Sequence, residues 1–275
     1  MHFSFTFNQI LWILTFAGQL TLLTVLLGQE RIRRFPFFTA SIALFTLRLL
    51  VETILSSRMA AIPFRITIVL LAFAVPFVGI LAAVEVARRA FAAAPGRVWR
   101  IAAPGAIVVA AAVAAFWGQW PVFRGFSWRN LFAVLSLLQF VAQKADHFYD
   151  LLILEAVLLI LLFGKRYGSG WLSHACSVAT GLGAVALSWV AIQAGWLIRL
   201  SYARPRTQQE YESLVSLGNA LMNMQKCVYL AAVIWWVYSL WRNESAAPDK
   251  SLAAPAPVEA AVDTLIEAPP EETVG

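Results

Sequence analysis

Residues 142–164 read AQKADHFYDLLILEAVLLILLFG, and this stretch decides how the rest of the chain is interpreted. It opens with four titratable residues, Lys144, Asp146, His147 and Asp150, and continues with residues that are all apolar except Glu155. A helix long enough to cross a bilayer seldom carries so many acids and bases, because a charge in the hydrocarbon layer is costly. We therefore expect the remaining segments to be membrane helices that cover these groups.

The composition of the whole chain indicates a multi-pass membrane protein. Of its 275 residues, 60% are hydrophobic and only 13% are charged, and the mean hydropathy is +0.73. A soluble domain has about 45–50% apolar and about 25% charged residues. Apolar blocks of about 20 residues, the length of a membrane span, recur from end to end. This arrangement leaves no room for a sizeable soluble domain.

The apolar blocks predict an all-α bundle of seven transmembrane helices. They are expected at residues 7–28, 36–55, 63–88, 101–117, 131–164, 171–197 and 214–241. A break at KADHFYD inside the fifth range would add an eighth helix, but each half would be shorter than the roughly 17 residues that a span requires. Residues 243–275 are rich in Ala, Pro and acids, which predicts a disordered acidic tail.

Seven helices place the two termini on opposite sides of the membrane. The loops on the side of the tail hold ten basic residues: Arg31, Arg33, Arg34, Arg88, Arg89, Arg97, Arg100, Lys165, Arg166 and Arg242. The other loops hold seven: Arg58, Arg65, Arg124, Arg129, Arg199, Arg204 and Arg206. The positive-inside rule then predicts a cytoplasmic tail and an external N-terminus.

This topology leads us to expect a protein of the bacterial cytoplasmic membrane. The net charge of +6 suits anionic lipid headgroups better than nucleic acid, and no nucleic-acid-binding motif is recognised. The expected partners are therefore the lipid bilayer and a cytoplasmic or membrane protein.

Two opposite charges are expected near the middle of the bilayer. Arg48 lies twelve residues after Pro36, and Glu155 lies nine residues before Gly164. At a rise of about 1.5 Å per residue they are about 18 Å and about 14 Å from the inner boundary. A lone charge at that depth costs at least about 2.5 kcal/mol, so one hypothesis is an ion pair between Arg48 and Glu155. The alternative is that Arg48 pairs with Glu52, one turn further along its own helix.

A second polar set is expected in the outer half of the bilayer, on three predicted helices. It comprises Glu52, Asp146, His147, Asp150, Asn223 and Lys226. Asp146 and Asp150 share a helix face, because they are four residues apart. One interpretation is a polar ligand pocket that opens outward, and another is a set of interfacial side chains that reach to water. A third is a metal site formed by Asp146, His147 and Asp150, for which one histidine and two acids are a weak signature.

No motif points to catalysis or to a cofactor. The chain has no nucleophile elbow, HExxH motif or P-loop, and we expect no catalytic residue, metal or cofactor. Lys226 on the seventh predicted helix invites comparison with a retinal-binding lysine, but the third predicted helix carries no acid before Glu85 as counter-ion. Cys176 and Cys227 fall in apolar segments on opposite halves of the bilayer, so no disulfide is expected between them.

The basic stretch RIRRFPFFTA (Arg31–Ala40) resembles part of a family of uncharacterised seven-helix membrane proteins of acidobacterial-type genomes. In that family, basic residues and then Phe-Pro-x-Phe lead into the second helix. The stretch VEVARRAF (Val84–Phe91) is similar to the end of the family's third helix, where an acid precedes basic residues. The resemblance would cover most of residues 1–242. It implies the seven-helix architecture and no particular activity.

Four functions remain open at this point. We expect a non-enzymatic, sensor- or receptor-like module whose pocket takes a small ligand. The alternatives are a transporter or channel component with Arg48 and Glu155 along its path, a structural subunit of a membrane complex, and an intramembrane enzyme that uses Asp146, His147 and Asp150. A cavity open to both sides of the membrane would favour transport. A pocket open only to the outside would favour sensing or catalysis, and the absence of a cavity would favour a structural role.

Overall fold

The computed structural model describes residues 6–55, 58–92, 96–118, 126–163, 173–202 and 207–242, with the backbone alone at 96–102 and 200–202. The chain divides into a unit ending at Asn243 and a second unit that begins at Glu244. The second unit, where the disordered tail was predicted, lies outside the described residues.

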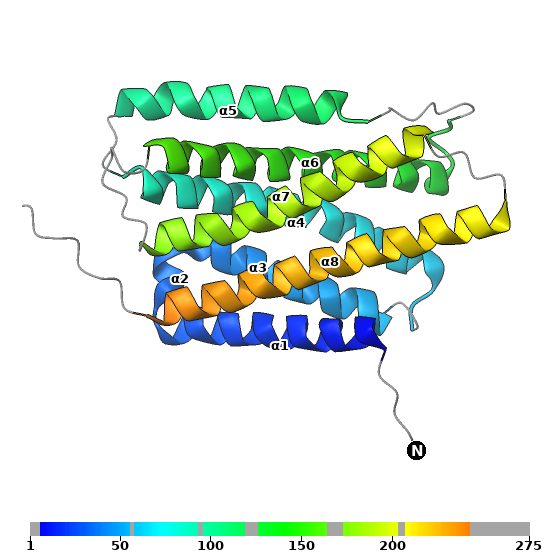
Figure 1. Ribbon diagram of the computed structural model, residues 1–275, viewed down its shortest axis with the longest axis horizontal. Coiled ribbons are helices and arrows are strands. Elements are labelled where there is room, and N and C mark those ends of the chain that lie inside the picture. Colours follow the sequence, from blue (N-terminus) through cyan, green and yellow to red (C-terminus); the bar gives the residue numbers. More distant parts are fainter. Residues whose placement is uncertain are drawn as a thin grey trace, which may run out of the picture. The chain divides into compact units, whose positions relative to one another are not determined.

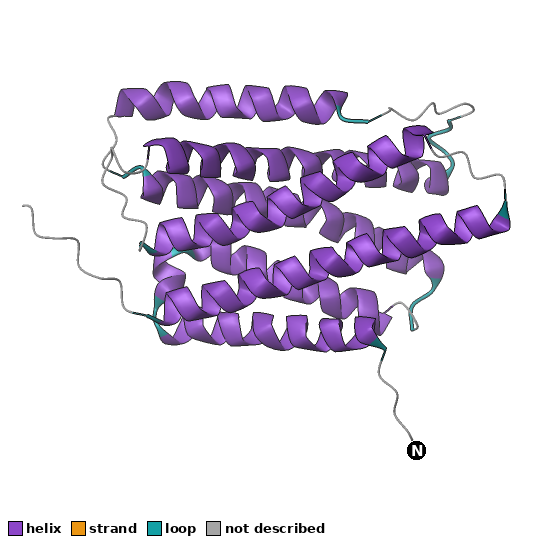
Figure 2. Ribbon diagram, in the orientation of Figure 1, coloured by secondary structure: helices purple, strands orange, loops and turns teal. Residues whose placement is uncertain are grey.

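Every regular element of the described residues is a helix (Figures 1 and 2). The elements are α1 (Phe7–Gly28), α2 (Arg31–Arg34), α3 (Pro36–Leu50) with its π-helical continuation η1 (Val51–Leu55), α4 (Ala61–Ala90), α5 (Gly96–Phe116), α6 (Leu131–Phe163), α7 (His174–Tyr202) and α8 (Gln208–Trp241). The all-α fold class is confirmed, and a helix occupies each of the seven predicted ranges.

Five of these helices are long and apolar enough to cross a membrane, which indicates a membrane protein. They are Phe7–Gly28, Pro36–Leu55, Ala61–Ala90, His174–Arg199 and Gln208–Trp241. The apolar part of α5 is the shorter stretch Ala103–Phe116. In α6, the acids and the lysine of residues 142–164 interrupt the apolar sequence. α5 therefore falls short on the length of its described apolar stretch, and α6 on its composition.

The largest differences from the predicted boundaries lie around residues 198–213. α7 continues to Tyr202, and α8 begins at Gln208, six residues before its predicted start. A capping box begins α8: Glu210 N donates to Thr207 Oγ1 at 3.2 Å, and Thr207 N donates to Glu210 Oε2 at 3.4 Å. This motif satisfies N–H groups at a helix start, whether or not the following turns are apolar. Hydropathy alone therefore placed the boundary too late.

Smaller differences occur elsewhere in the chain. α4 extends the predicted range by two residues at each end, α5 begins at Gly96 instead of residue 101, and α2 forms in a predicted linker. α6 is one continuous helix of 33 residues, without a break at KADHFYD. The single helix keeps Lys144, Asp146, His147, Asp150 and Glu155 on one rigid element.

Six helices form a closed ring of neighbours in the order α1, α3, α4, α6, α7 and α8, with α8 returning to α1. α4 also contacts α7 across the ring. α5 packs mainly on α6 and lies outside the ring, at the edge of the view in Figure 1. Segments at the two ends of the described chain, α1 and α8, are thus direct neighbours.

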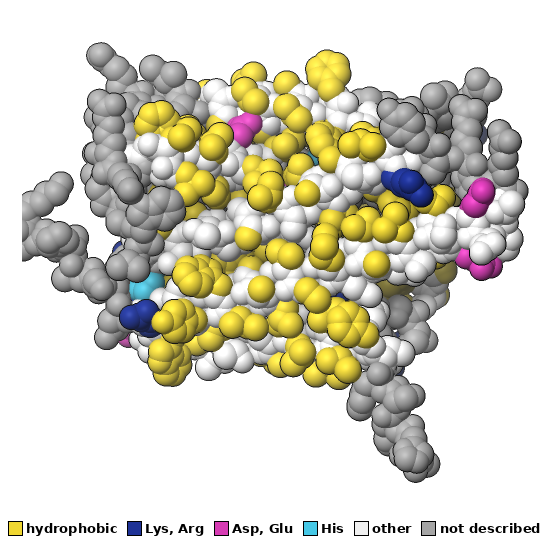
Figure 3. Space-filling model, viewed as in Figure 1, with side chains coloured by type: hydrophobic (Ala, Val, Ile, Leu, Met, Phe, Trp, Pro, Cys, Tyr) yellow, Lys and Arg dark blue, Asp and Glu magenta, His cyan; other side chains and the backbone are white. Residues whose placement is uncertain are grey.

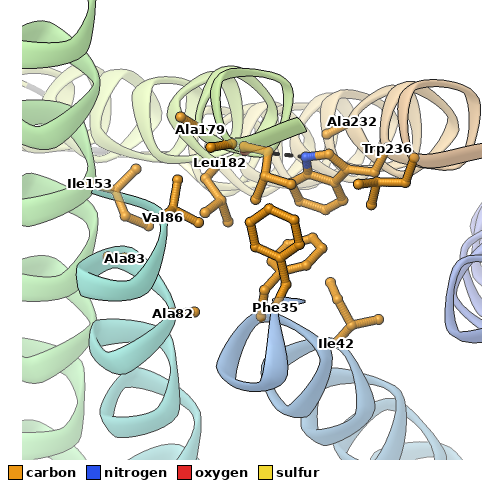
Figure 4. Packing of buried hydrophobic residues seen from close by; sticks show 14 of the residues in the cluster. Phe35, Ile42, Ala82, Ala83, Val86, Ile153, Ala179, Leu182, Ala232 and Trp236 are labelled. Atoms are coloured by element: carbon orange, nitrogen blue, oxygen red, sulfur yellow. Dashed lines mark hydrogen bonds between the residues drawn. The ribbon is translucent and has the colours of Figure 1, made fainter. Parts of the chain in front are cut away.

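A buried apolar cluster fills one end of the ring. Figure 4 shows Trp236 of α8, Leu182 of α7 and Phe35, the residue just before α3, pointing toward one another. The Trp236 indole Nε1 donates to the Val178 carbonyl at 3.3 Å. The indole fits because α7 has glycine opposite it: a Cβ on Gly181 would lie 2.6 Å from Trp236 Cε2. Glycine at this position therefore permits the close approach of α7 and α8.

Glu85 of α4 fixes the start of α3. Its Oε2 accepts hydrogen bonds from the backbone N–H groups of Phe37 and Phe38, both at 3.1 Å. Pro36 stands in the first turn and needs no such acceptor. A carboxylate at a helix N-terminus also interacts favourably with the helix dipole. Glu85 therefore caps a neighbouring helix, and it also forms an ion pair with Arg89, whose Nη2 lies 3.9 Å from Glu85 Oε1.

The outer surface of the helices is largely apolar. Figure 3 shows hydrophobic side chains spread over the visible face, with few charged ones among them. Leu70, Phe77 and Val108 are each 65% exposed, and Phe116 is 88% exposed. Such exposure is costly in water and favourable in lipid hydrocarbon.

Candidate functional site

A cavity of about 380 Å³ lies inside the ring of six helices. Its lining comprises Thr15 and Gln19 of α1; Ser41, Ile42, Phe45, Arg48 and Leu49 of α3; Glu52 of η1; Val75 of α4; Asp146, Tyr149, Asp150 and Ile153 of α6; Leu182, Val185, Ala186 and Trp189 of α7; and Gln225, Lys226, Tyr229 and Trp236 of α8. Each of the six ring helices contributes to this wall, and no described residue of α5 does. A mostly apolar cavity with a few convergent polar groups is the usual form of a small-molecule site.

The cavity adjoins the apolar cluster. Ile42, Leu182 and Trp236 belong both to its wall and to the cluster. Glu52 lies ten residues further along the α3–η1 segment than Ile42, or about 15 Å at the helical rise. The exposed side chains of the wall, Glu52 and Lys226, are at this far end. The cavity is therefore backed by tightly buried side chains on one end and bordered by charged, exposed ones on the other.

Arg48 forms its ion pair with Glu52. Its Nε donates to Glu52 Oε1 at 2.8 Å, one turn further along the same segment. Arg48 is also near enough to Asp146 for an electrostatic interaction across the ring. The hypothesis of a pair between Arg48 and Glu155 is wrong, and the alternative within one helix is what forms.

The position of Glu155 on α6 explains this outcome. Glu155 follows Asp146 by nine residues, which is two and a half helical turns at about 3.6 residues per turn, so the two side chains leave opposite faces of α6. Glu155 also follows Lys144 by eleven residues, close to three full turns, and Lys144 Nζ donates to the carbonyls of Ala114 and Trp117 at the end of α5. Glu155 therefore lies on the side of α6 that faces α5. Its Oε2 has no hydrogen-bond partner among the described residues.

Four of the six predicted pocket residues line the cavity together: Glu52, Asp146, Asp150 and Lys226. His147 and Asn223 are partly buried but do not belong to the wall. The His147 ring lies 6.4 Å from the Trp117 ring, on the side of α5. Adjacent helical residues point about 100° apart, so His147 cannot share the face of Asp146.

Two buried polar side chains of the wall retain unused hydrogen-bonding capacity. Asp150 is 8% exposed, and within the described residues no hydrogen bond or ion pair reaches its carboxylate. Gln19 is 2% exposed; its Nε2 donates to Tyr229 Oη at 2.9 Å, but its Oε1 has no partner among the described residues. Buried polar groups normally have partners, because an unmet group keeps its full desolvation cost.

Lys226 is held at the rim of the cavity. Its Nζ donates to Asn8 Oδ1, which joins the beginning of α1 to the middle of α8. Nearby on the wall, Gln225 Oε1 accepts from Ser188 Oγ at 2.6 Å. Lys226 and Arg48 are the two basic residues that the described chain contributes to the wall.

Sequence reasoning missed the neutral polar and aromatic part of the wall. Gln19, Trp189, Gln225 and Tyr229 line the cavity but were not singled out. Gln19 and Gln225 stand in otherwise apolar helical stretches, which is a usable signal, because an amide in hydrocarbon needs a partner. Trp189 and Tyr229 give no such signal, since aromatic residues are as common in packed cores.

The metal alternative finds no support in the part of the chain that the structure describes. No group of three or more His, Cys, Asp or Glu side chains there could hold a metal ion. Cys176 and Cys227 are both free, as expected, although Cys227 is exposed and only Cys176 is buried. The wall is therefore best understood from its charges, amides and aromatic rings.

Comparisons of the chain with protein-family models, with curated proteins and with solved structures found no match. The resemblance to a seven-helix family of acidobacterial type stays a prediction.

Proposed function

We propose that this chain is a non-enzymatic, sensor- or receptor-like membrane protein that binds a small molecule in the cavity inside its helix ring. The observation that carries the proposal is the wall itself: all six ring helices contribute to it. A ligand in such a site contacts every helix at once. Differential contacts with two arrangements of the helices are what couples a ligand to a conformational change.

The proposal includes seven membrane crossings, with the N-terminus outside and the tail in the cytoplasm of a bacterial cell. The excess of basic residues on the tail side supports this orientation. The charged rim of the cavity lies at the end where α1 begins and η1 ends. In the proposed orientation this end faces outward, and the apolar cluster closes the cytoplasmic side. A ligand would then enter from outside, and the cytoplasmic ends of the helices would pass its effect to a partner protein.

The transport alternative requires a path through the apolar cluster. Phe35, Phe38 and Trp236 are each less than 2% exposed in that region, and protein interiors of this kind are close-packed. The closed end favours sensing over transport. It equally suits a structural subunit if the cavity holds only water or lipid.

The test is ligand binding to the purified protein in lipid nanodiscs, with a variant in which the cavity is filled. Ala186 is 1% exposed and lines the wall, so Ala186→Phe places a ring in the cavity. Ala191→Phe on the exposed face of the same helix is the matched control. A compound library should contain molecules that raise the melting temperature of the wild type and of Ala191→Phe but not of Ala186→Phe. If every stabilising compound acts equally on all three proteins, the cavity is not a binding site.

A further inference from the structure

The negative and positive charges of the ionisable side chains in the cavity wall are not equal in number. Three acids, Glu52, Asp146 and Asp150, stand against two bases, Arg48 and Lys226. Arg48 is shared between Glu52, which it bonds directly, and Asp146, which it attracts across the ring. Lys226 is bonded to Asn8 at the rim. With all five groups ionised, the wall carries one uncompensated negative charge.

Asp150 is the acid left without a cation. It is more than nine-tenths buried, it lines the cavity, and within the described residues nothing donates to its carboxylate. Asp146, on the same face of α6, is near enough to repel it. A buried carboxylate in this position is strongly destabilised unless a cation or a donor joins it.

The rest of the wall suits an apolar body attached to such a cation. Phe45, Trp189 and Tyr229 contribute aromatic rings from three different helices, and aromatic faces attract organic cations as well as apolar groups. An inorganic ion would leave most of the 380 Å³ and its apolar lining unfilled.

We infer that the cavity binds an organic cation, an amine with an apolar or aromatic body, whose ammonium group is paired with Asp150. This inference rests on the proposed function and names the chemical class of the ligand. The ammonium donates to the Asp150 carboxylate, and the body of the molecule occupies the space between the aromatic rings of α3, α7 and α8.

The test uses three probes of matched shape: 4-phenylbutylammonium, 4-phenylbutanol and 4-phenylbutyrate. Binding to the full chain in nanodiscs is measured by calorimetry, with the heat of empty nanodiscs subtracted. The ammonium should bind about tenfold or more tightly than the alcohol, because a charge-assisted hydrogen bond replaces a neutral one, and the carboxylate should bind most weakly. An alcohol that binds as tightly as the ammonium overturns the inference.

Two variants of α6 assign the effect to one side chain. Asp150→Asn should weaken the ammonium about tenfold or more and leave the alcohol nearly unchanged. Glu155→Gln makes the same chemical change on the face toward α5 and should leave both affinities as in the wild type. A third variant, Lys226→Met, removes a cation from the wall and should tighten ammonium binding. Undiminished ammonium affinity in Asp150→Asn contradicts the assignment.

The outcomes separate this inference from the proposed function. If ammonium and alcohol bind equally, and both are lost in Ala186→Phe, the cavity binds ligands and only the cation assignment fails. If Ala186→Phe changes the binding of none of the three probes, the cavity is not the site, and both proposals fail.

Discussion

Arg48 Nε donates a 2.8 Å hydrogen bond to Glu52 Oε1 at the rim of the cavity, within one continuous helical segment. Both side chains are partly exposed, at 31% and 43%, so the pair should contribute only about 0.5 kcal/mol to stability. A double-mutant cycle with Arg48→Met and Glu52→Gln, followed by thermal unfolding in detergent, should give a coupling energy of this size.

The matched cycle pairs Arg48→Met with Glu155→Gln. Glu155 lies on the side of α6 that faces α5 and is not paired with Arg48. The changes that the two substitutions make in the free energy of unfolding should therefore add, within the ordinary error of about 0.5 kcal/mol for uncoupled sites. A larger coupling between residues 48 and 155 than between residues 48 and 52 would contradict the pairing described here.

Asp150 should reduce the stability of the empty protein. Asp150→Asn keeps the shape of the side chain and removes the charge that no described group compensates. The variant should therefore raise the stability of the ligand-free protein by about 1 kcal/mol or more. Thermal unfolding without added ligand measures this, and a lower melting temperature would show that the carboxylate has a partner in the native state.

Gly181 should be intolerant of any side chain. A Cβ there would lie 2.6 Å from Trp236 Cε2, and the indole is buried in the apolar cluster and cannot move away. Gly181→Ala should cost about 1–3 kcal/mol, the range for an overpacked core. Gly195→Ala is the control in the same helix, because a Cβ there meets nothing within 4 Å. Equal stability of the two variants would rule out close packing of α7 on α8 at this point.

Glu85 should stabilise the start of α3 through its two backbone hydrogen bonds. Glu85→Ala removes both acceptors and should cost about 1–2 kcal/mol, as the loss of a helix cap does. Glu85→Gln keeps one acceptor oxygen and loses the charge, so it should cost less, about 0.3–1 kcal/mol. Thermal unfolding of both variants tests the order. If alanine is tolerated as well as glutamine, the contact with α3 contributes nothing.

The helix content and much of the pocket could be predicted from the sequence, because they depend on local patterns. Apolar blocks marked the seven ranges, and the spacing of Asp146 and Asp150 placed both on one face, where both line the cavity. The same helical period argues against grouping Glu155 or His147 with them, since nine residues and one residue do not bring side chains onto one face. The predicted pairing of Arg48 with Glu155 rested on similar depth in the bilayer alone, and depth does not determine the direction in which a side chain leaves its helix.

Other features could not be predicted, because they depend on contacts between distant segments. Gln19 of α1 meets Tyr229 of α8 only once the ring closes, and Glu85 reaches the start of α3 from another helix. The start of α8, which was predicted six residues too late, is a different case. The Thr207–Glu210 capping box is visible in the sequence, but it lies in a polar stretch that hydropathy assigned to a loop.

The central claim, a cavity that opens only to the outside, is tested most directly by the chemical accessibility of single cysteines. Ala186 and Ala179, seven residues apart on the same face of α7, both belong to the apolar cluster, but only Ala186 also lines the cavity. Each is replaced by Cys in a chain in which Cys176 and Cys227 are replaced by Ala. A charged, membrane-impermeant thiol reagent is then added to spheroplasts or to inverted vesicles.

We predict that Ala186→Cys reacts in spheroplasts and not in inverted vesicles, and that Ala179→Cys reacts in neither. Reaction of Ala186→Cys from both sides would contradict the account and indicate a transport path. Reaction from neither side would contradict it as well and leave the ring of helices a structural unit.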